Sequence, residues 1–187
     1  MTDWNKRIME KIEEYINESK YSYSSVQLTI TDETLKEKIF KLGSLIKEED
    51  LYEENGYGRE LSPHITVKYG IHSSNINEIT NVIKNYKKKK VNYEILEISK
   101  FESDLYDVLI LKVESEDLRT LNKMLEDNLK VTNTHPVYNP HITLAYVKKG
   151  VADNFINSNK SDLNNTKYFE NNLVFSDKNG LERIINL

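Results

Sequence analysis

The chain has 187 residues and a formal net charge of −4, and 38% of its residues are hydrophobic. The apolar content and the small net charge exclude an intrinsically disordered chain. The slight acidity argues against a general binder of long nucleic acid, which needs a basic surface. The sequence contains no cysteine, which excludes disulfide frameworks, thiolate metal sites and cysteine nucleophiles.

The spacing of apolar residues predicts alternating helices and strands along the chain. In chain order we expect a helix over residues 3–18, a strand over 23–30, a helix over 33–47, a strand over 64–69, a helix over 75–88, a hairpin of strands 91–101 and 106–114, a helix over 116–129, a strand over 141–147, a short helix over 151–157, and strands over 168–176 and 181–186. No linker rich in proline, glycine or serine divides this order. We therefore expect one α+β domain over residues 21–187, with residues 1–20 as an N-terminal helical extension.

The N-terminal sequence does not resemble a targeting segment. The first twenty residues carry a charge every two or three positions, so they lack the apolar region of a signal peptide. No apolar run elsewhere approaches the length of a membrane-spanning helix. We expect a cytoplasmic protein without a membrane partner.

One short block occurs twice. Residues 63–69 read PHITVKY and residues 140–146 read PHITLAY, with the second histidine 77 residues after the first and five of seven positions identical. In a regular strand, alternate residues share a face, so His64, Thr66 and Lys68 are expected on one face and the apolar residues on the core face. A purely structural duplication would preserve only the apolar positions. The retained polar residues instead indicate a site built by both copies.

The residue types in the repeat suit phosphodiester cleavage. Of two facing histidines, His64 and His141, a neutral one can take a proton from an attacking hydroxyl and a protonated one can give a proton to the leaving oxygen, since both forms exist near a pKa of about 6.5. The hydroxyls of Thr66 and Thr143 can donate to non-bridging phosphate oxygens. The sequence does not determine which histidine acts first. Lys68 would favour a neutral His64, which makes His64 the expected initial base.

The sequence also resembles a known family. Residues 62–72 (SPHITVKYGIH) followed by residues 139–147 (NPHITLAYV) resemble the 2H phosphoesterase superfamily, which includes RNA 2′,3′-cyclic phosphodiesterases and 2′-5′ oligoadenylate phosphodiesterases. The segments 23–28 and 106–109 add a resemblance to the phage-encoded branch that degrades the cyclic oligonucleotide messengers of the bacterial CBASS defence. The resemblance implies an α+β, bilobal fold with two pseudo-symmetric antiparallel-sheet lobes, outer helices and a central cleft.

The resemblance also implies roles for individual residues. His64 and His141 would be the catalytic pair, with Thr66 and Thr143 holding the phosphate. In the phage branch, aromatic residues and a carboxylate bind the bases, and the candidates here are Tyr23, Phe101 and Glu170, with Lys68 as a further substrate contact. The expected partner is a small cyclic di- or trinucleotide, in the host cytoplasm if the chain is phage-encoded. Catalysis would need no cofactor and no metal.

Two alternatives remain open at this point. One is processing of RNA ends, such as hydrolysis of 2′,3′-cyclic phosphates or cleavage of 2′-5′ linkages. The other is a sponge that binds cyclic nucleotides without cleaving them, although binding alone does not need an acid and a base. His72 and His135 fall in expected loops next to the two motifs, where a histidine is usually only solvated.

Overall fold

The computed structural model describes residues 21–54, 57–135, 137–159 and 161–187. The expected helix over residues 3–18 and the proposed extension over residues 1–20 lie outside the described residues. One antiparallel sheet of eight strands, in the order β6-β3-β4-β5-β2-β1-β7-β8, organises the rest of the chain. The strands are β1 (Ser24–Thr29), β2 (His64–Ile71), β3 (Val91–Glu102), β4 (Tyr106–Glu114), β5 (His141–Lys148), β6 (Thr166–Glu170), β7 (Asn172–Ser176) and β8 (Glu182–Asn186).

The helices connect these strands, and each of the four described α-helices buries apolar residues. They are α2 (Glu33–Ser44), the 3-10 turn η1 (Glu48–Asp50), α3 (Ile76–Ile83), α4 (Glu116–Asn128) and α5 (Val151–Ser158). Side chains of Asp32 and Ser115 cap α2 and α4 by accepting from the N–H groups of Leu35 and Leu118. Within the described part of the chain, no helix has the length and apolar character that crossing a membrane requires.

Among the described residues, the order of α-helices and strands matches the expectation with one exception. Residues 168–176 do not form a single strand, because the chain changes partner at Asn171. β6 pairs with β3, whereas β7 pairs with β1. The chain thus passes from one half of the sheet to the other within a few residues, which the continuous β-forming sequence did not indicate.

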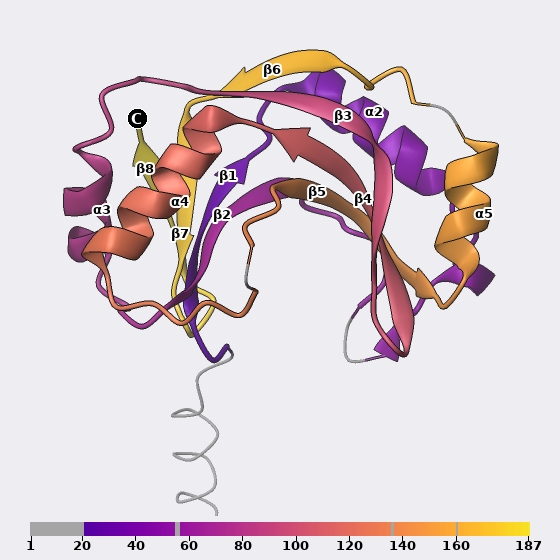
Figure 1. Cartoon of the computed structure of the whole chain (residues 1–187), viewed down its shortest axis with the longest axis horizontal. Helices are drawn as coiled ribbons and strands as arrows, with labels where there is room; N and C mark the ends of the chain where they lie inside the picture. Colours follow the sequence, from indigo (N-terminus) through magenta and orange to yellow (C-terminus); the bar gives the residue numbers. More distant parts are fainter. Residues whose placement is uncertain (1–20, 55–56, 136, 160) are drawn as a thin grey trace, which may run out of the picture.

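The sheet divides into two equivalent halves between β5 and β2. One half has the order β2-β1-β7-β8 and the other has the order β5-β4-β3-β6. Helix α2 follows β1 and contacts β5, and helix α4 follows β4 and contacts β2. Figure 1 shows the sheet curled into an arch, with α3 and α4 at one end and α2 and α5 at the other. The expected pseudo-symmetric lobes are therefore present, joined through one continuous sheet.

The segment that precedes each motif strand hydrogen-bonds to the motif strand of the other half. The N–H groups of Tyr52 and Glu60 donate to carbonyls of β5, at Tyr146 and Leu144. In the other half, the N–H of Thr132 donates to the carbonyl of Gly70 in β2. Each motif strand is thus flanked by the segment that leads into the other one, which ties the two halves together at the centre of the molecule.

The core lies between the helices and one face of the sheet. The sheet contributes Val26, Leu28, Ile65, Val67, Ile142 and Leu144, and the helices contribute Leu35, Ile39, Ile79, Leu118, Leu121, Leu125 and Phe155. Burying each such side chain stabilises the fold by about 1.5–3 kcal/mol. The opposite side of the sheet, which we call the open face, carries the histidines and threonines of both motifs.

Candidate active site

The two motif strands meet at the centre of the sheet. Ile65 of β2 lies opposite Ile142 of β5 in an antiparallel pair. Continuing this register by one residue on either side places His64 opposite Thr143 and Thr66 opposite His141, all on the open face. The two histidines are then diagonal neighbours, about 7–8 Å apart between Cα atoms. This arrangement groups two imidazoles and two hydroxyls around one point of the open face.

Both imidazoles are held in the same orientation. Nδ1 of His64 lies 2.8 Å from the carbonyl oxygen of Ser62, and Nδ1 of His141 lies 2.8 Å from the carbonyl oxygen of Asn139. A carbonyl can only accept, so Nδ1 carries the proton in each ring and the lone pair of a neutral imidazole is on Nε2. Neither Nε2 forms a hydrogen bond with another described residue. The duplicated strand start therefore leaves two equivalent nitrogens for chemistry.

The environment of His141 differs from that of its counterpart. Burial lowers the pKa of His141 from its ordinary value, and the charges of His64 and His135 lower it further. The ring of Phe101 meets the His141 ring edge-on, with 4.8 Å between centroids. The structure thus brings Phe101, a predicted site residue, into contact with one of the two motif histidines. A lowered pKa favours the neutral imidazole, which is the form a general base needs.

The expectation that Lys68 shares a face with His64 and Thr66 is wrong, because β2 is not a regular strand. Gln27 pairs with Thr66 but its neighbour Val26 pairs with Lys68, so Val67 is an extra residue and forms a β-bulge. Beyond a bulge the alternation of faces is reversed. Lys68 is consequently turned to the helix-covered face, where its side chain is 6% exposed.

The partners of Lys68 explain how a buried ammonium is accommodated. Its Nζ lies 2.9 Å from a carboxylate oxygen of Glu126 in α4 and 2.8 Å from the side-chain oxygen of Asn133. The hydrogen bond from Lys68 lowers the pKa of Glu126, which keeps that carboxylate charged. The Lys68 charge is therefore compensated within the fold. Lys68 therefore gives no reason to expect that His64 is the initial base. The lowered pKa of His141 instead favours His141 as the initial base.

The second motif strand has the same irregularity at the equivalent position. Ile110 pairs with Thr143 and Leu109 with Ala145, so Leu144 is the extra residue. Beyond the bulge, Ala145 is on the helix-covered face and Tyr146 returns to the open face, as does its counterpart in β2, Tyr69. Simple alternation placed both tyrosines on the core face. The sequence did contain one indication that the tyrosines belong to the open face. Both copies of the block retain the tyrosine, as they retain the histidine and the threonine.

The structure places the remaining predicted residues at two other positions. Tyr23 lies at the far end of β2 from His64, with its ring 5.7 Å from that of Tyr69. Glu170 is buried, and its carboxylate accepts from the N–H and hydroxyl of Thr31, just beyond the end of β1. Both Glu170 oxygens are thus engaged by the start of α2. In the loop after β2, Nε2 of His72 forms a hydrogen bond with the hydroxyl oxygen of Thr132, with 2.8 Å between the two atoms.

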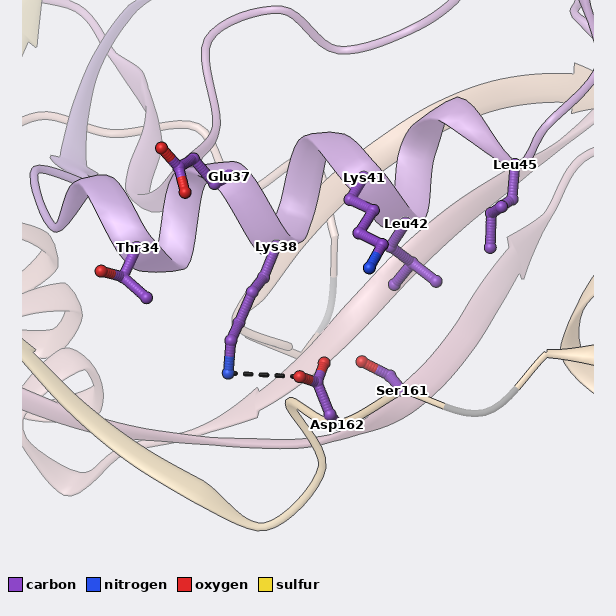
Figure 2. Close-up of a pocket in the computed structure, with 8 residues that line it drawn as sticks. All are labelled: Thr34, Glu37, Lys38, Lys41, Leu42, Leu45, Ser161 and Asp162. Atoms are coloured by element: carbon purple, nitrogen blue, oxygen red, sulfur yellow. Dashed lines mark ion pairs between the residues drawn. The ribbon is translucent and has the colours of Figure 1, made fainter.

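Two surface pockets lie outside this constellation. Figure 2 shows one of about 450 Å³ beside α2, where Lys38 and Asp162 form an ion pair of 3.2 Å. The other is lined by Thr31, Asp32, Lys167, Tyr168, Phe169, Glu170 and Asn171. Neither lining includes a motif histidine or threonine. Among the described residues, no group of three or more histidine or acidic side chains is arranged to hold a metal ion.

Comparison with known proteins places this site in a family. A family model for the 2′-5′ RNA ligase superfamily matches residues 45–159, which include both motif strands. The chain belongs to this superfamily, the 2H phosphoesterases. Phosphodiester chemistry is the activity of the family. No curated protein sequence matches the chain significantly.

Solved structures agree with the fold of this 2H phosphoesterase. Usb1 of Kluyveromyces marxianus is similar with a TM-score of 0.60 and 13% identity, over 92% of this chain and 100% of that one. Escherichia coli LigT in complex with 3′-AMP is similar with a TM-score of 0.57 and 13% identity, over 89% of this chain and 96% of that one. At such identities the likeness establishes the fold alone.

Proposed function

We propose that this 2H phosphoesterase is a metal-independent phosphodiesterase that cleaves cyclic oligonucleotide messengers such as 3′,3′-cyclic GMP-AMP, and so removes the signal of the CBASS defence. The observation that carries the proposal is the pair of equally oriented histidines, each with Nε2 free beside a threonine. The resemblance to the phage-encoded branch supports the cyclic substrate. The compensated charge of Lys68 and the net charge of −4 both favour a small substrate over long nucleic acid.

The mechanism uses the two imidazoles in different protonation states. Neutral His141 takes the proton of the ribose 2′-hydroxyl next to the scissile phosphate through Nε2. The resulting oxygen attacks phosphorus, protonated His64 donates its Nε2 proton to the leaving 5′-oxygen, and a 2′,3′-cyclic phosphate forms. Water can then open this product with the roles exchanged. Proton count and charge balance without a further reactant.

The threonines act on the phosphate while the histidines act on the reacting oxygens. The hydroxyls of Thr66 and Thr143 form no hydrogen bond with another described residue, so both are free to donate to the non-bridging oxygens. Charge on those oxygens grows as the attacking bond forms, and fixed donors stabilise it without reorganisation. Since each threonine lies opposite a histidine, the phosphorus is held between the base and the acid.

Processing of RNA ends remains the alternative within the same chemistry, since opening a 2′,3′-cyclic phosphate is the second half of the proposed reaction. It would use the same four side chains on a substrate with a single base at the reacting phosphate. A sponge is the alternative without chemistry. It would leave the two free Nε2 atoms without a use.

The test is cleavage of 3′,3′-cyclic GMP-AMP in excess EDTA, with products separated by chromatography and identified by mass spectrometry. We expect linear product from the wild type, unaffected by EDTA, and a loss of at least about 100-fold in His64→Ala and His141→Ala. An analogue with 2′-deoxyribose at both positions should resist cleavage. Rapid cleavage of that analogue would contradict the mechanism, and intact ligand recovered from denatured protein would support the sponge.

A further inference from the structure

The short segment that leads into β5 contacts both motifs. Tyr138 lies three residues before His141, and its hydroxyl donates to the backbone carbonyl of Thr66 in β2, with 2.9 Å between the two oxygens. The next residue, Asn139, has the carbonyl that orients the His141 ring at 2.8 Å. Two consecutive residues thus hold the threonine of one motif and the histidine of the other.

The Tyr138 contact lies where the two motif strands separate. The register of β2 with β5 consists of one residue pair, Ile65 with Ile142. Beyond this pair, each strand bridges to the segment that leads into the other motif. The hydroxyl of Tyr138 therefore supplies a hydrogen bond to β2 directly beside the point at which the strands part.

A second side chain holds the bulge of β2. Asn122 of α4 is buried, and its amide nitrogen Nδ2 donates to the carbonyl oxygen of Val67, the extra residue, at 2.6 Å. In β5 the carbonyl of the equivalent extra residue, Leu144, accepts from the backbone N–H of Glu60 at 3.0 Å. Side chains thus fix this part of the first motif, whereas a backbone group fixes the bulge of the second.

The tyrosine is a feature of one half only. The position 77 residues before Tyr138 is Leu61, which has no hydroxyl and is 77% exposed. Tyr138 is instead half-buried and packs against the core. Burial raises the pKa of the Tyr138 phenol, so the proton that it donates stays on the oxygen at physiological pH. The duplicated block alone therefore does not account for this contact.

We propose that Tyr138 is a positioning residue of the active site, which holds Thr66 opposite His141. A shift of the Thr66 backbone would move its hydroxyl away from the non-bridging phosphate oxygen. A shift of Asn139 would release the imidazole that takes the first proton. Such displacements matter because a misplacement of about 1 Å can cost roughly 100-fold in rate. The inference rests on the proposed function for the roles of Thr66 and His141, and it adds a residue that acts through both.

The chain offers a matched control for this hydroxyl. Tyr86 is also half-buried, and its hydroxyl donates to the backbone carbonyl of Lys90 at 3.2 Å. This contact belongs to the connection between α3 and β3, outside both motif strands. Tyr138→Phe and Tyr86→Phe each remove a hydroxyl that donates to a carbonyl, and each retains the ring. A merely structural role of Tyr138 predicts that both variants keep the wild-type kcat once folded.

The experiment measures kcat and KM on 3′,3′-cyclic GMP-AMP, with urea unfolding to check the fold of each full-length variant. We expect Tyr138→Phe to lower kcat by roughly 10- to 100-fold with little change in KM, and Tyr86→Phe to keep both values. In a Thr66→Val background, Tyr138→Phe should lower kcat much less, because the hydroxyl that it positions is already absent. Asn122→Leu is a second variant and should also lower kcat, since it frees the carbonyl that follows Thr66.

A spectroscopic measurement tests the inference without turnover. Nitrogen NMR shifts of the neutral His141 ring report which nitrogen carries the proton. We expect Nδ1 in the wild type and in Tyr86→Phe, and a mixture of both tautomers in Tyr138→Phe, because Asn139 is then held less firmly.

The two proposals can fail separately. If the wild type cleaves cyclic GMP-AMP and Tyr138→Phe retains its kcat, or loses no more than Tyr86→Phe, the inference is overturned and the proposed function stands. An undiminished effect of Tyr138→Phe in the Thr66→Val background would also overturn it. If the wild type cleaves neither cyclic GMP-AMP nor 2′,3′-cyclic AMP, the proposed function fails. The tautomers then decide the inference, and a single Nδ1–H form in Tyr138→Phe would overturn it.

Discussion

The two halves of the sheet share a backbone plan but surround their histidines differently. Each histidine is oriented by the carbonyl two residues earlier, at the same 2.8 Å, and each strand has its bulge after the threonine. Around this plan, His141 is half-buried beside Phe101, and desolvation lowers its pKa. The comparison teaches that duplication supplies two equally oriented nitrogens, and that their neighbours differ; under the proposed mechanism this difference assigns the base to His141 and the acid to His64.

The largest expected effect separates the two roles. With cyclic GMP-AMP, His64→Ala and His141→Ala should each lose about 10²–10⁴-fold in rate. With uridine 3′-(p-nitrophenyl phosphate), whose phenolate leaves without being protonated, His64→Ala should regain most of the wild-type rate, because only the acid becomes dispensable. Release of nitrophenolate measures this directly.

The matched control for that prediction is His141→Ala on the same activated substrate. It should stay slow, since the attacking hydroxyl still needs a base. Rescue of His141→Ala in place of His64→Ala would exchange the two assignments. Equal rescue of both variants would mean that neighbouring residues do not divide the roles at all.

A second prediction concerns the strand ends, where the halves differ in backbone. Gly70 has φ of +91°, and a Cβ there would lie 2.0 Å from the Thr132 carbonyl oxygen. Gly150 has a similar φ of +86° with nothing within 4 Å, so it is the matched control. Gly150→Ala should cost about 1–2 kcal/mol of unfolding free energy in urea, and Gly70→Ala more than about 3 kcal/mol. Equal losses would show that the close approach of Thr132 contributes nothing.

A third prediction follows from the ion pair between the buried Lys68 and Glu126. Lys68→Met should lower the free energy of unfolding by about 1–3 kcal/mol, because Glu126 and Asn133 lose their partner. The value of kcat/KM should change little, since the ammonium lies on the helix-covered face. Glu126→Gln is the control for the charge alone. A loss of kcat/KM as large as that of Thr66→Val would restore Lys68 to the site.

The smallest expected effect is the pH dependence of stability. Because burial lowers the pKa of His141 in the folded state, the unfolded chain binds more protons at acidic pH. The contribution of His141 to the free energy of unfolding should therefore have its full value above about pH 6.5, the ordinary histidine pKa. It should decrease as the pH falls toward the lower pKa of the folded state. His141→Gln should reduce this slope in urea titrations. The same slope in both proteins would contradict the lowered pKa.

Much of the fold and part of the site could be predicted from the sequence. The helical and strand periodicities gave the element order, and the repeated His-x-Thr block indicated which strands meet. Alternation could not show the bulges at Val67 and Leu144, because one extra residue in a strand leaves no pattern of its own. The faces of Lys68 and Tyr69 were therefore misassigned. The partner of Glu170 depends on contacts 139 residues apart, which no local pattern contains.

The exchange of flanking segments between the halves has a consequence for folding kinetics. The segment around residues 51–60 hydrogen-bonds to β5 across about ninety positions of chain, and β2 meets β5 at a separation of 77 residues. Contacts this distant in sequence form only after long loops have been closed at an entropic cost. We therefore expect the two histidines to become neighbours late in folding. A partly synthesised or truncated chain that ends before β5 lacks His141 and the pairing between β2 and β5.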